Sequence, residues 1–337
     1  MQFALFTTYL LCMGINRCPS IITFSENYTS SWIIFEGKVE NEIKMSRLTF
    51  LLFKTTILSR SIQSIIYRPV VLMHGIVASA SDMNELADWL RTSFSGIYVV
   101  SIEIGNGFDD SFLWSLDKQV EYFCTKIRND INLQKGFNML GFSQGSLIVR
   151  GAVERCSLPV YNLITLNGLH QGIFGIPYLL KLPIYIRELI TKYAYEKQMQ
   201  NRISIANYWR DPTQLNKYIA DCHFLPDINN EHEIRNETYR INMLKLNAFV
   251  MTYSDIDEVV TPKESGWFMG YISQSLYIET WNNSRQFTED LIGMRTLWKQ
   301  GKLYTFISHT RHQDTPHLPN REFFMKNILS FFNNTLL

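Results

Sequence analysis

The sequence has little net charge, few cysteines and no long apolar run. It carries 32 basic and 31 acidic side chains, a formal net charge of +1, and charged residues make up only 19% of the chain. Phosphate binding needs a clear basic excess, so a broad nucleic-acid surface is excluded. Five cysteines in 337 residues are too few for a disulfide scaffold. No apolar run reaches the ~18 to 20 residues that span a bilayer, so no transmembrane segment is expected.

Apolar residues are plentiful. They make up 46% of the chain, and aromatic residues make up 14%. This balance excludes intrinsic disorder, because disordered chains combine low hydrophobicity with high net charge. At this length the chain can form one large domain or two ordinary ones, each with a substantial core.

The amino terminus is apolar but continues no domain pattern. An uncharged apolar stretch runs from Phe3 to Leu11, without the Lys or Arg that normally precedes it in a secretory signal. A second candidate start is Met45, where a basic residue precedes a short apolar run. We therefore expect residues 1–67 to be either a signal or leader segment or a gene-model extension. Sequons for N-glycosylation favour the secretory route; they stand at Asn27 and, as glycosylation candidates in the domain, at Asn236, Asn282 and Asn333.

Strands and helices alternate from residue 69 onward. Residues 69–73 are an apolar run typical of a buried parallel strand, and residues 79–94 have helical spacing. A second strand is expected at 97–102, a helix at about 114–127 and a third strand at 138–140. This alternation predicts an α/β fold, a mostly parallel sheet with helices on both faces.

Residues 141–145, Gly-Phe-Ser-Gln-Gly, are the motif that carries the chemistry. They follow an apolar strand and precede a helical run at 147–153, which is the context of a nucleophile elbow. The turn holds its serine at strained dihedrals, so the neighbouring residues must be small, and Gly141 and Gly145 supply that room. The following helix points backbone N–H groups at a developing oxyanion. Ser143 is therefore the candidate nucleophile.

An elbow serine needs an acid and a histidine further along the chain. Residues 246–253 are an apolar strand, and in the loop after it Asp257 fits best as the acid, with Asp255 as the alternative. The histidine should follow a last strand, at 303–307. Three histidines lie in the loop there, at positions 309, 312 and 317, and spacing alone does not choose among them.

Several longer stretches are more specific than the elbow. They are HGI at 74–76, GIYVVSIEIG at 96–105, GFNMLGFSQGS at 136–146, HQGIFGIP at 170–177, ANYWRDP at 206–212 and ESGWF at 264–268. Through them the sequence resembles the palmitoyl-protein thioesterases, and within that family it is closer to the type 1 branch. The resemblance implies that Ser143 is the nucleophile and that the backbone N–H groups of Ile76 and Gln144 form the oxyanion hole. It also implies that Asp257 is the acid.

The resemblance favours one histidine without excluding the others. The family's histidine is followed by Leu and then by a helix, and His317-Leu318 matches that pattern best. Counting from the last strand favours His312 instead, because this loop is longer than the family's. We therefore expect His317 to be the base, with His312 as the second choice and His309 as the third.

The resemblance also implies one disulfide. Cys124 and Cys156 stand at the positions of a family disulfide, so we expect a bridge between them; the alternative is two buried free thiols. The family's other disulfide positions are not cysteine here, because residues 78–81 are Ala-Ser-Ala-Ser.

The expected architecture is an α/β-hydrolase fold over residues 68–337, with a mostly helical insertion at about 173–245 between nucleophile and acid. The resemblance implies that long-chain acyl groups are removed from cysteine thioesters of S-palmitoylated proteins or peptides, in the lysosome or after secretion. The product would be a long-chain fatty acid. No cofactor or metal is expected, since no metal-ligand spacing is present. The alternatives are a broader acyl-thioesterase or lipid esterase, and a catalytically weakened binding protein.

Overall fold

In the computed structural model of the protein, residues 20–24, 31–35, 66–175 and 192–336 are described. The chain divides into two compact units, residues 1–64 and 65–337. In the first unit, strand β1 (Ser20–Phe24) pairs antiparallel with β2 (Ser31–Phe35). Most of the segment expected to be a leader or gene-model extension lies outside the described residues, and that expectation stays a prediction.

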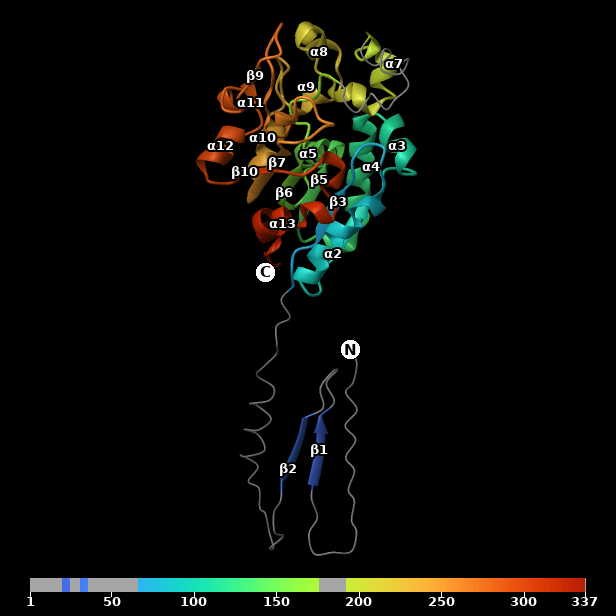
Figure 1. Cartoon of the computed structure of the whole chain (residues 1–337), viewed down its shortest axis with the longest axis vertical. Coiled ribbons are helices and arrows are strands. Elements are labelled where there is room, and N and C mark those ends of the chain that lie inside the picture. Colours follow the sequence, from blue (N-terminus) through green and yellow to red (C-terminus); the bar gives the residue numbers. More distant parts are fainter. Residues whose placement is uncertain (1–19, 25–30, 36–65, 176–191, 337) are drawn as a thin grey trace, which may run out of the picture. The chain divides into compact units, whose positions relative to one another are not determined.

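Six parallel strands form the central sheet of the second unit, in the order β10-β7-β6-β5-β3-β4 (Figure 1). The five strands expected from the sequence are confirmed to within two residues at each end, whereas β6 was not predicted. The bounds of the six strands are β3 Val70–Met73, β4 Val99–Ile102, β5 Phe137–Phe142, β6 Val160–Leu166, β7 Ala248–Ser254 and β10 Leu303–Ser308.

Alternate strand residues pack into two separate cores. In β3, Val71 and Met73 belong to one core, whereas Val70 and Leu72 belong to the other. Helices α4 (Leu116–Asn129) and α5 (Gln144–Cys156) cover the first core, and α2 (Asn84–Ser93) and the carboxyl-terminal helical segment cover the second. Because both faces are buried, the strands are almost continuously apolar rather than alternating.

Three helical regions differ in detail from the sequence-based expectation. The helix expected at 79–94 begins with a 3-10 turn, η1 (Ala80–Met83), before α2. From residues 321–332 the sequence predicts one closing helix, but the structure has a short α13 (Arg321–Phe323) followed by a π-helical turn at 324–328 and a 3-10 turn at 329–332. Helix α3 (Phe108–Leu113) was not predicted, since six residues are too few to show helical periodicity.

The described part of the segment between β6 and β7 is helical, as expected. It contains α7 Lys197–Gln200, η4 Ser204–Tyr208, η5 Pro212–Gln214, α8 Leu215–Asp221, α9 Leu225–Ile228 and α10 Glu237–Leu244. Residues 176–191 of the expected insertion lie outside the described residues. Between β7 and β10 follow η6 Lys263–Trp267, β8 Gly270–Tyr271, β9 Ile278–Glu279, α11 Arg285–Thr288 and α12 Met294–Lys299.

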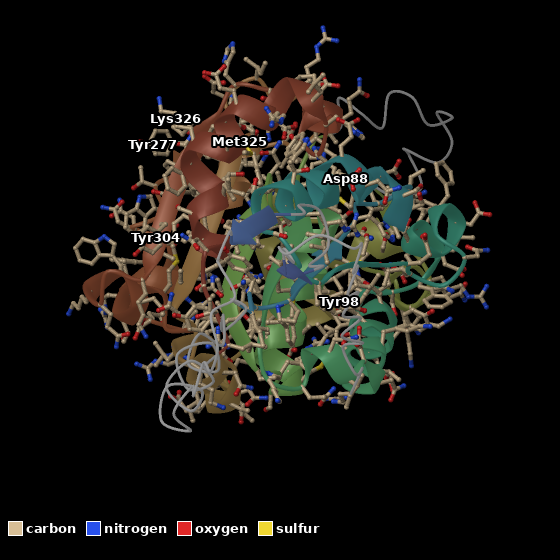
Figure 2. All side chains as sticks on the ribbon, turned by 90° about the horizontal axis from the view of Figure 1, so that it is seen from below. Asp88, Tyr98, Tyr277, Tyr304, Met325 and Lys326 are labelled. Carbon is tan, nitrogen blue, oxygen red and sulfur yellow. A yellow bond between two sulfur atoms is a disulfide. The ribbon has the colours of Figure 1, made fainter. Side chains whose placement is uncertain are left out.

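Exposed tyrosines stand at separate places on the surface, among them Tyr98, Tyr277 and Tyr304 (Figure 2). Among the helices of the described ranges, none combines the length and the apolar character that crossing a membrane requires.

A disulfide and a buried ion pair fix helix α5. The expected Cys124–Cys156 bridge is present and joins α4 to the last residue of α5. Arg150, completely buried in α5, donates to Glu154 at 3.0 Å, to the carbonyl of Ile228 at 3.1 Å and to the Asn229 side chain at 2.8 Å. The arginine thus ties the helix after the elbow to α9 of the insertion. Burial raises the pKa of Glu154 from 4.5 to about 7, against the opposing pull of Arg150.

Replacing Glu154 with Gln should therefore change how stability depends on pH. Because the carboxyl ionises more readily in the unfolded chain, Glu154 removes stability as the pH rises from 4.5 to about 7. The amide does not titrate, so the stability of Glu154→Gln relative to wild type should rise across this window, by roughly 3 kcal/mol at most. Urea unfolding at the two ends of the window measures this difference, and a difference that stays constant with pH contradicts it.

Candidate active site

Ser143 occupies a sharp turn between β5 and α5. Its backbone has φ 53° and ψ −126°, and its N–H donates to the carbonyl of Leu166 at 2.9 Å. A Cβ on Gly145 would lie 2.3 Å from the carbonyl oxygen of His74, and one on Gly141 would lie 2.4 Å from that of Gly145. Any side chain at either position would therefore push the turn apart. The local geometry is that expected of a nucleophile elbow.

His312 lies between Ser143 and Asp257. Its Nε2 is 2.8 Å from Ser143 Oγ, and its Nδ1 is 2.7 Å from Asp257 Oδ2. The other carboxylate oxygen of Asp257 accepts from the N–H groups of Val259 and Val260, at 2.8 and 2.9 Å. The His312 and Asp257 side chains are only 7% and 1% exposed. A serine, a histidine and a carboxylate are thus aligned in one buried chain of hydrogen bonds.

The structure does not bring His317, the expected base, to Ser143. His317 Nδ1 lies 3.1 Å from a carboxylate oxygen of Glu85 in α2, and the other oxygen accepts from Leu318 N–H at 2.7 Å. His309 pairs instead with Asp255 at 2.8 Å on the surface. The second choice, His312, therefore replaces His317 beside the nucleophile, and Asp257 rather than Asp255 is its partner.

The physical reason lies in the path of the loop after β10. Thr310 N–H donates to Ser254 Oγ at 3.1 Å, which ties the loop to the end of β7. A 3-10 turn, η7 (His312–Asp314), then begins at once and places the His312 ring over Phe142, with ring centroids 5.0 Å apart. By His317 the chain has passed the site and starts a second turn, η8 (Leu318–Asn320), beside α2.

Two backbone N–H groups remain available beside Ser143. Within the described ranges, neither Ile76 N–H nor Gln144 N–H donates to a protein acceptor. Gln144 is the first residue of α5, so its N–H also lies at the positive end of the helix dipole. Its side chain is held away from the serine, donating to Ser111 carbonyl at 2.8 Å and accepting from Tyr208 hydroxyl at 3.0 Å. Both expected oxyanion-hole residues are thus free to donate to a substrate oxygen.

A cavity of about 370 Å³ opens beside Ser143. Its lining is almost entirely apolar and comes from the loop after β3, from α3, from the insertion and from the loop that carries Asp257. The lining residues are Ile76, Val77, Phe108, Asp109, Phe112, Leu113, Ser143, Leu169, Ile173, Gly175, Ile205, Tyr208, Val259 and Val260. Phe108 and Leu113 are also exposed, so α3 forms part of the mouth. Helix α3 is too short to show helical periodicity in the sequence, so Phe108 and Leu113 were not predicted to line the cavity.

Burial shifts the pKa values of nearby polar side chains toward the neutral form. It lowers the pKa of His74, two residues before Ile76, and raises that of the Tyr208 hydroxyl in the cavity wall.

No group of three or more His, Cys, Asp or Glu side chains suited to a metal occurs among the described residues. The asparagines of three sequons, Asn236, Asn282 and Asn333, are exposed, and Asn27 lies outside the described residues.

The fold and the Ser143–His312–Asp257 arrangement are those of an α/β hydrolase.

The profile of a family described as palmitoyl protein thioesterase matches residues 69–312. The chain is 42% identical over 251 residues to palmitoyl-protein thioesterase 3 of Dictyostelium discoideum, covering 74% of this chain and 86% of that protein. It is 34% identical over 260 residues to palmitoyl-protein thioesterase 1 of Caenorhabditis elegans, covering 74% and 87%. With lysosomal thioesterase PPT2 of Mus musculus it shares 27% identity over 253 residues, covering 72% and 82%. The chain belongs to the palmitoyl protein thioesterase family, which confirms the resemblance read from its motifs.

The geometry makes opposite predictions for two histidines. His312→Ala should lower kcat by about 10⁴-fold or more, because the serine loses the group that removes its proton. His317→Ala should leave kcat close to wild type, since it loses only a contact with Glu85. Hydrolysis of an activated acyl ester measures both. A large loss from His317→Ala with an active His312→Ala would contradict this assignment.

Proposed function

We propose that the protein is a palmitoyl-protein thioesterase that removes long-chain acyl groups from cysteine thioesters of proteins or peptides. The observation that carries the proposal is the contact between a complete serine–histidine–carboxylate array and an apolar cavity. Ser143 itself lines that cavity, and His312 lies 2.8 Å from its hydroxyl. The array supplies acyl-transfer chemistry and the cavity supplies a place for a fatty chain.

In this mechanism His312 takes the proton of Ser143 as the hydroxyl attacks the thioester carbonyl. Asp257 holds the imidazole with Nδ1–H donating to it and stabilises the imidazolium that forms. Backbone N–H groups of Ile76 and Gln144 stabilise the oxyanion. The cysteine leaves as thiol, taking the proton from His312, and the acyl group stays on Ser143. His312 then activates a water that releases the fatty acid.

The relatives named as lysosomal thioesterases support a lysosomal location, reached through the secretory pathway. Three exposed sequons, at Asn236, Asn282 and Asn333, are consistent with that route. S-acylated proteins or peptides are then the substrates, met during degradation.

A broader acyl-thioesterase or lipid esterase is the second candidate. It is favoured by the cavity lining, in which Asp109 is the one charged residue among the described lining residues. An apolar wall holds the acyl chain and discriminates weakly among the groups to which the chain is attached.

A substrate series distinguishes the two functions. We expect kcat/KM to be lowest for palmitoyl oxygen esters of matched peptides, because a thiolate is a better leaving group than an alkoxide. Palmitoyl-cysteine peptides and palmitoyl-coenzyme A share the thioester, so a higher value for the peptides than for palmitoyl-coenzyme A would report recognition of the peptide. Equal values for all three would favour the broader enzyme. Ser143→Ala should abolish turnover of each substrate, and turnover that survives this change would refute the serine mechanism.

Filling the cavity should shift the preferred chain length. Ile205 lies in η4 and lines the cavity, so Ile205→Trp should fill part of the space that a long chain would occupy. Loss of contact for three methylenes would cost ~2.4 kcal/mol, or about 50-fold in kcat/KM for palmitoyl substrates, with little change for butanoyl substrates. Ile241→Trp is the matched control, because Ile241 is exposed on α10, outside the cavity lining. Equal effects on both chain lengths would contradict this assignment of the cavity.

A further inference from the structure

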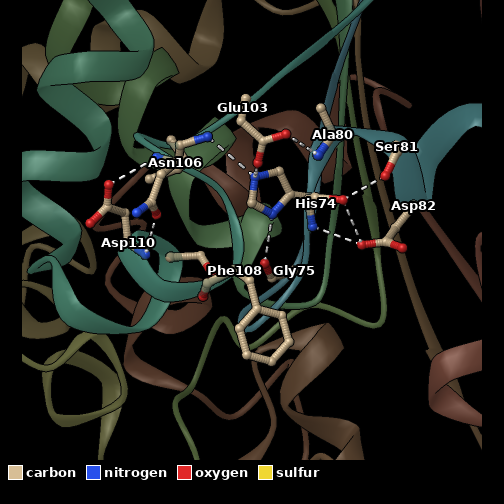
Figure 3. A network of polar contacts seen from close by, with 12 residues as sticks. His74, Gly75, Ala80, Ser81, Asp82, Glu103, Asn106, Phe108 and Asp110 are labelled. Atoms are coloured by element: carbon tan, nitrogen blue, oxygen red, sulfur yellow. Dashed lines mark hydrogen bonds and ion pairs between the residues drawn. The ribbon is translucent and has the colours of Figure 1, made fainter.

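His74 is a fully buried histidine that the reaction does not use directly. It stands at the end of β3, immediately before the loop that carries Ile76. Figure 3 shows its ring between the Gly75 carbonyl on one side and Glu103 on the other. The buried imidazole thus contacts the Gly75 carbonyl, the Ile104 N–H and the Glu103 carboxylate, close to Ser143.

The first contact joins His74 to the peptide that contains the oxyanion donor. His74 Nδ1 lies 2.8 Å from the carbonyl oxygen of Gly75. That carbonyl and the N–H of Ile76 belong to one planar peptide group, in which they point in opposite directions. A hydrogen bond that fixes the direction of the Gly75 carbonyl therefore fixes the direction of the Ile76 N–H.

The second contact determines which ring nitrogen carries the proton. Ile104 N–H donates to His74 Nε2 at 3.3 Å, so Nε2 must be unprotonated and Nδ1 carries the hydrogen. Burial lowers the pKa of His74, against the opposing effects of the hydrogen bond to Gly75 and of the Glu103 charge, which favours the neutral ring. The neutral Nδ1–H form is the one that donates to Gly75.

Glu103 lies on the Nε2 side of the ring and makes no hydrogen bond with it among the described contacts. One Glu103 carboxylate oxygen is 3.5 Å from His74 Nε2, which carries no hydrogen in this tautomer, and the other oxygen accepts from Ala80 N–H at 2.8 Å. The peptide held by His74 also lies close to the nucleophile, since a Cβ on Gly75 would be 3.2 Å from Ser143 Cβ. A small rotation of this peptide would thus turn the Ile76 N–H away from the reacting carbonyl.

We propose that His74 is a positioning residue that holds the Gly75–Ile76 peptide in the orientation required by the oxyanion hole. This inference rests on the proposed function, because it assumes that Ser143 forms an oxyanion. His74 contacts no substrate and acts only through the peptide that it holds. It should therefore affect the stability of the transition state more than the binding of the substrate.

Two amide variants separate the contacts of the ring. The amide nitrogen of Asn can occupy the place of Nδ1, so His74→Asn retains a donor to the Gly75 carbonyl. The longer Gln reaches the place of Nε2, so His74→Gln retains only the contact with Ile104. We expect His74→Gln to lower kcat by about 10- to 100-fold with KM little changed, less than the loss of a whole oxyanion donor. His74→Asn should restore kcat to within a few-fold of wild type.

A transition-state analogue gives a readout that a merely structural role would not move. A long-chain alkyl trifluoromethyl ketone forms a tetrahedral adduct with the serine, so its affinity should fall by the same factor as kcat/KM across the variants, while the affinity for palmitate stays constant. Thermal unfolding checks that each variant is folded. In the wild-type protein, ¹⁵N shifts of the imidazole should show hydrogen on Nδ1, a test that needs no variant.

The outcomes that overturn the proposal are distinct from failure of the proposed function. Equal activity of the Asn and Gln variants, a loss confined to KM, or hydrogen on Nε2 each overturns it. Failure of wild type to cleave palmitoyl-cysteine peptides overturns the proposed function alone, because the His74 comparison can then use any ester that the enzyme hydrolyses. If no ester is hydrolysed, the rate at which a fluorophosphonate labels Ser143 replaces kcat in the same comparison.

Discussion

The strained backbone of Ser143 is the constraint on which the rest of the site depends. A non-glycine residue at φ 53° and ψ −126° costs roughly 1–3 kcal/mol, and it persists only when its surroundings hold it. Here β5 is buried along its whole length, α5 is buried almost completely, and Ser143 N–H is bonded to β6. The strained turn places Ser143 between the end of β5 and the start of α5, with its hydroxyl 2.8 Å from His312 Nε2.

The parallel sheet then determines where partners of the serine can stand. Loops that follow β5, β7 and β10 emerge at the same edge, because parallel strands share the direction of their carboxyl ends. Asp257 and His312 come from the second and third of these loops. Asp257 is further restrained by two backbone donors, which leaves a single carboxylate oxygen for the histidine. The sheet therefore brings the three loops to the same edge, and short turns within the loops align the side chains of Asp257 and His312 with Ser143.

The sequence was informative wherever a local pattern determines structure. Five of the six strands of the central sheet, the elbow and the position of Asp257 follow from apolar runs, small residues and the loop directly after a strand. The histidine did not follow, because its place depends on contacts such as Thr310 with Ser254, which join segments 56 residues apart. The resemblance to the family pattern favoured His317. In the structure, the N–H of its neighbour Leu318 instead donates to the Glu85 carboxylate in α2. Helix α3 was not predicted for a simpler reason, because six residues are too few to show helical periodicity.

Gln144 joins the chemistry of the elbow to the walls of the cavity. Its backbone N–H begins helix α5 directly after Ser143, while its side chain bonds the Ser111 carbonyl in α3 and the Tyr208 hydroxyl of the insertion. The Ser111 hydroxyl in turn accepts from the N–H of Val77, the residue after Ile76. The oxyanion loop, the elbow, α3 and the insertion thus share one buried set of hydrogen bonds. Because these bonds are buried, breaking one leaves an unpaired polar group at a cost of about 1–3 kcal/mol. The cavity walls therefore cannot move far without disturbing the residues on either side of Ser143, because the cavity and the elbow are held by the same contacts.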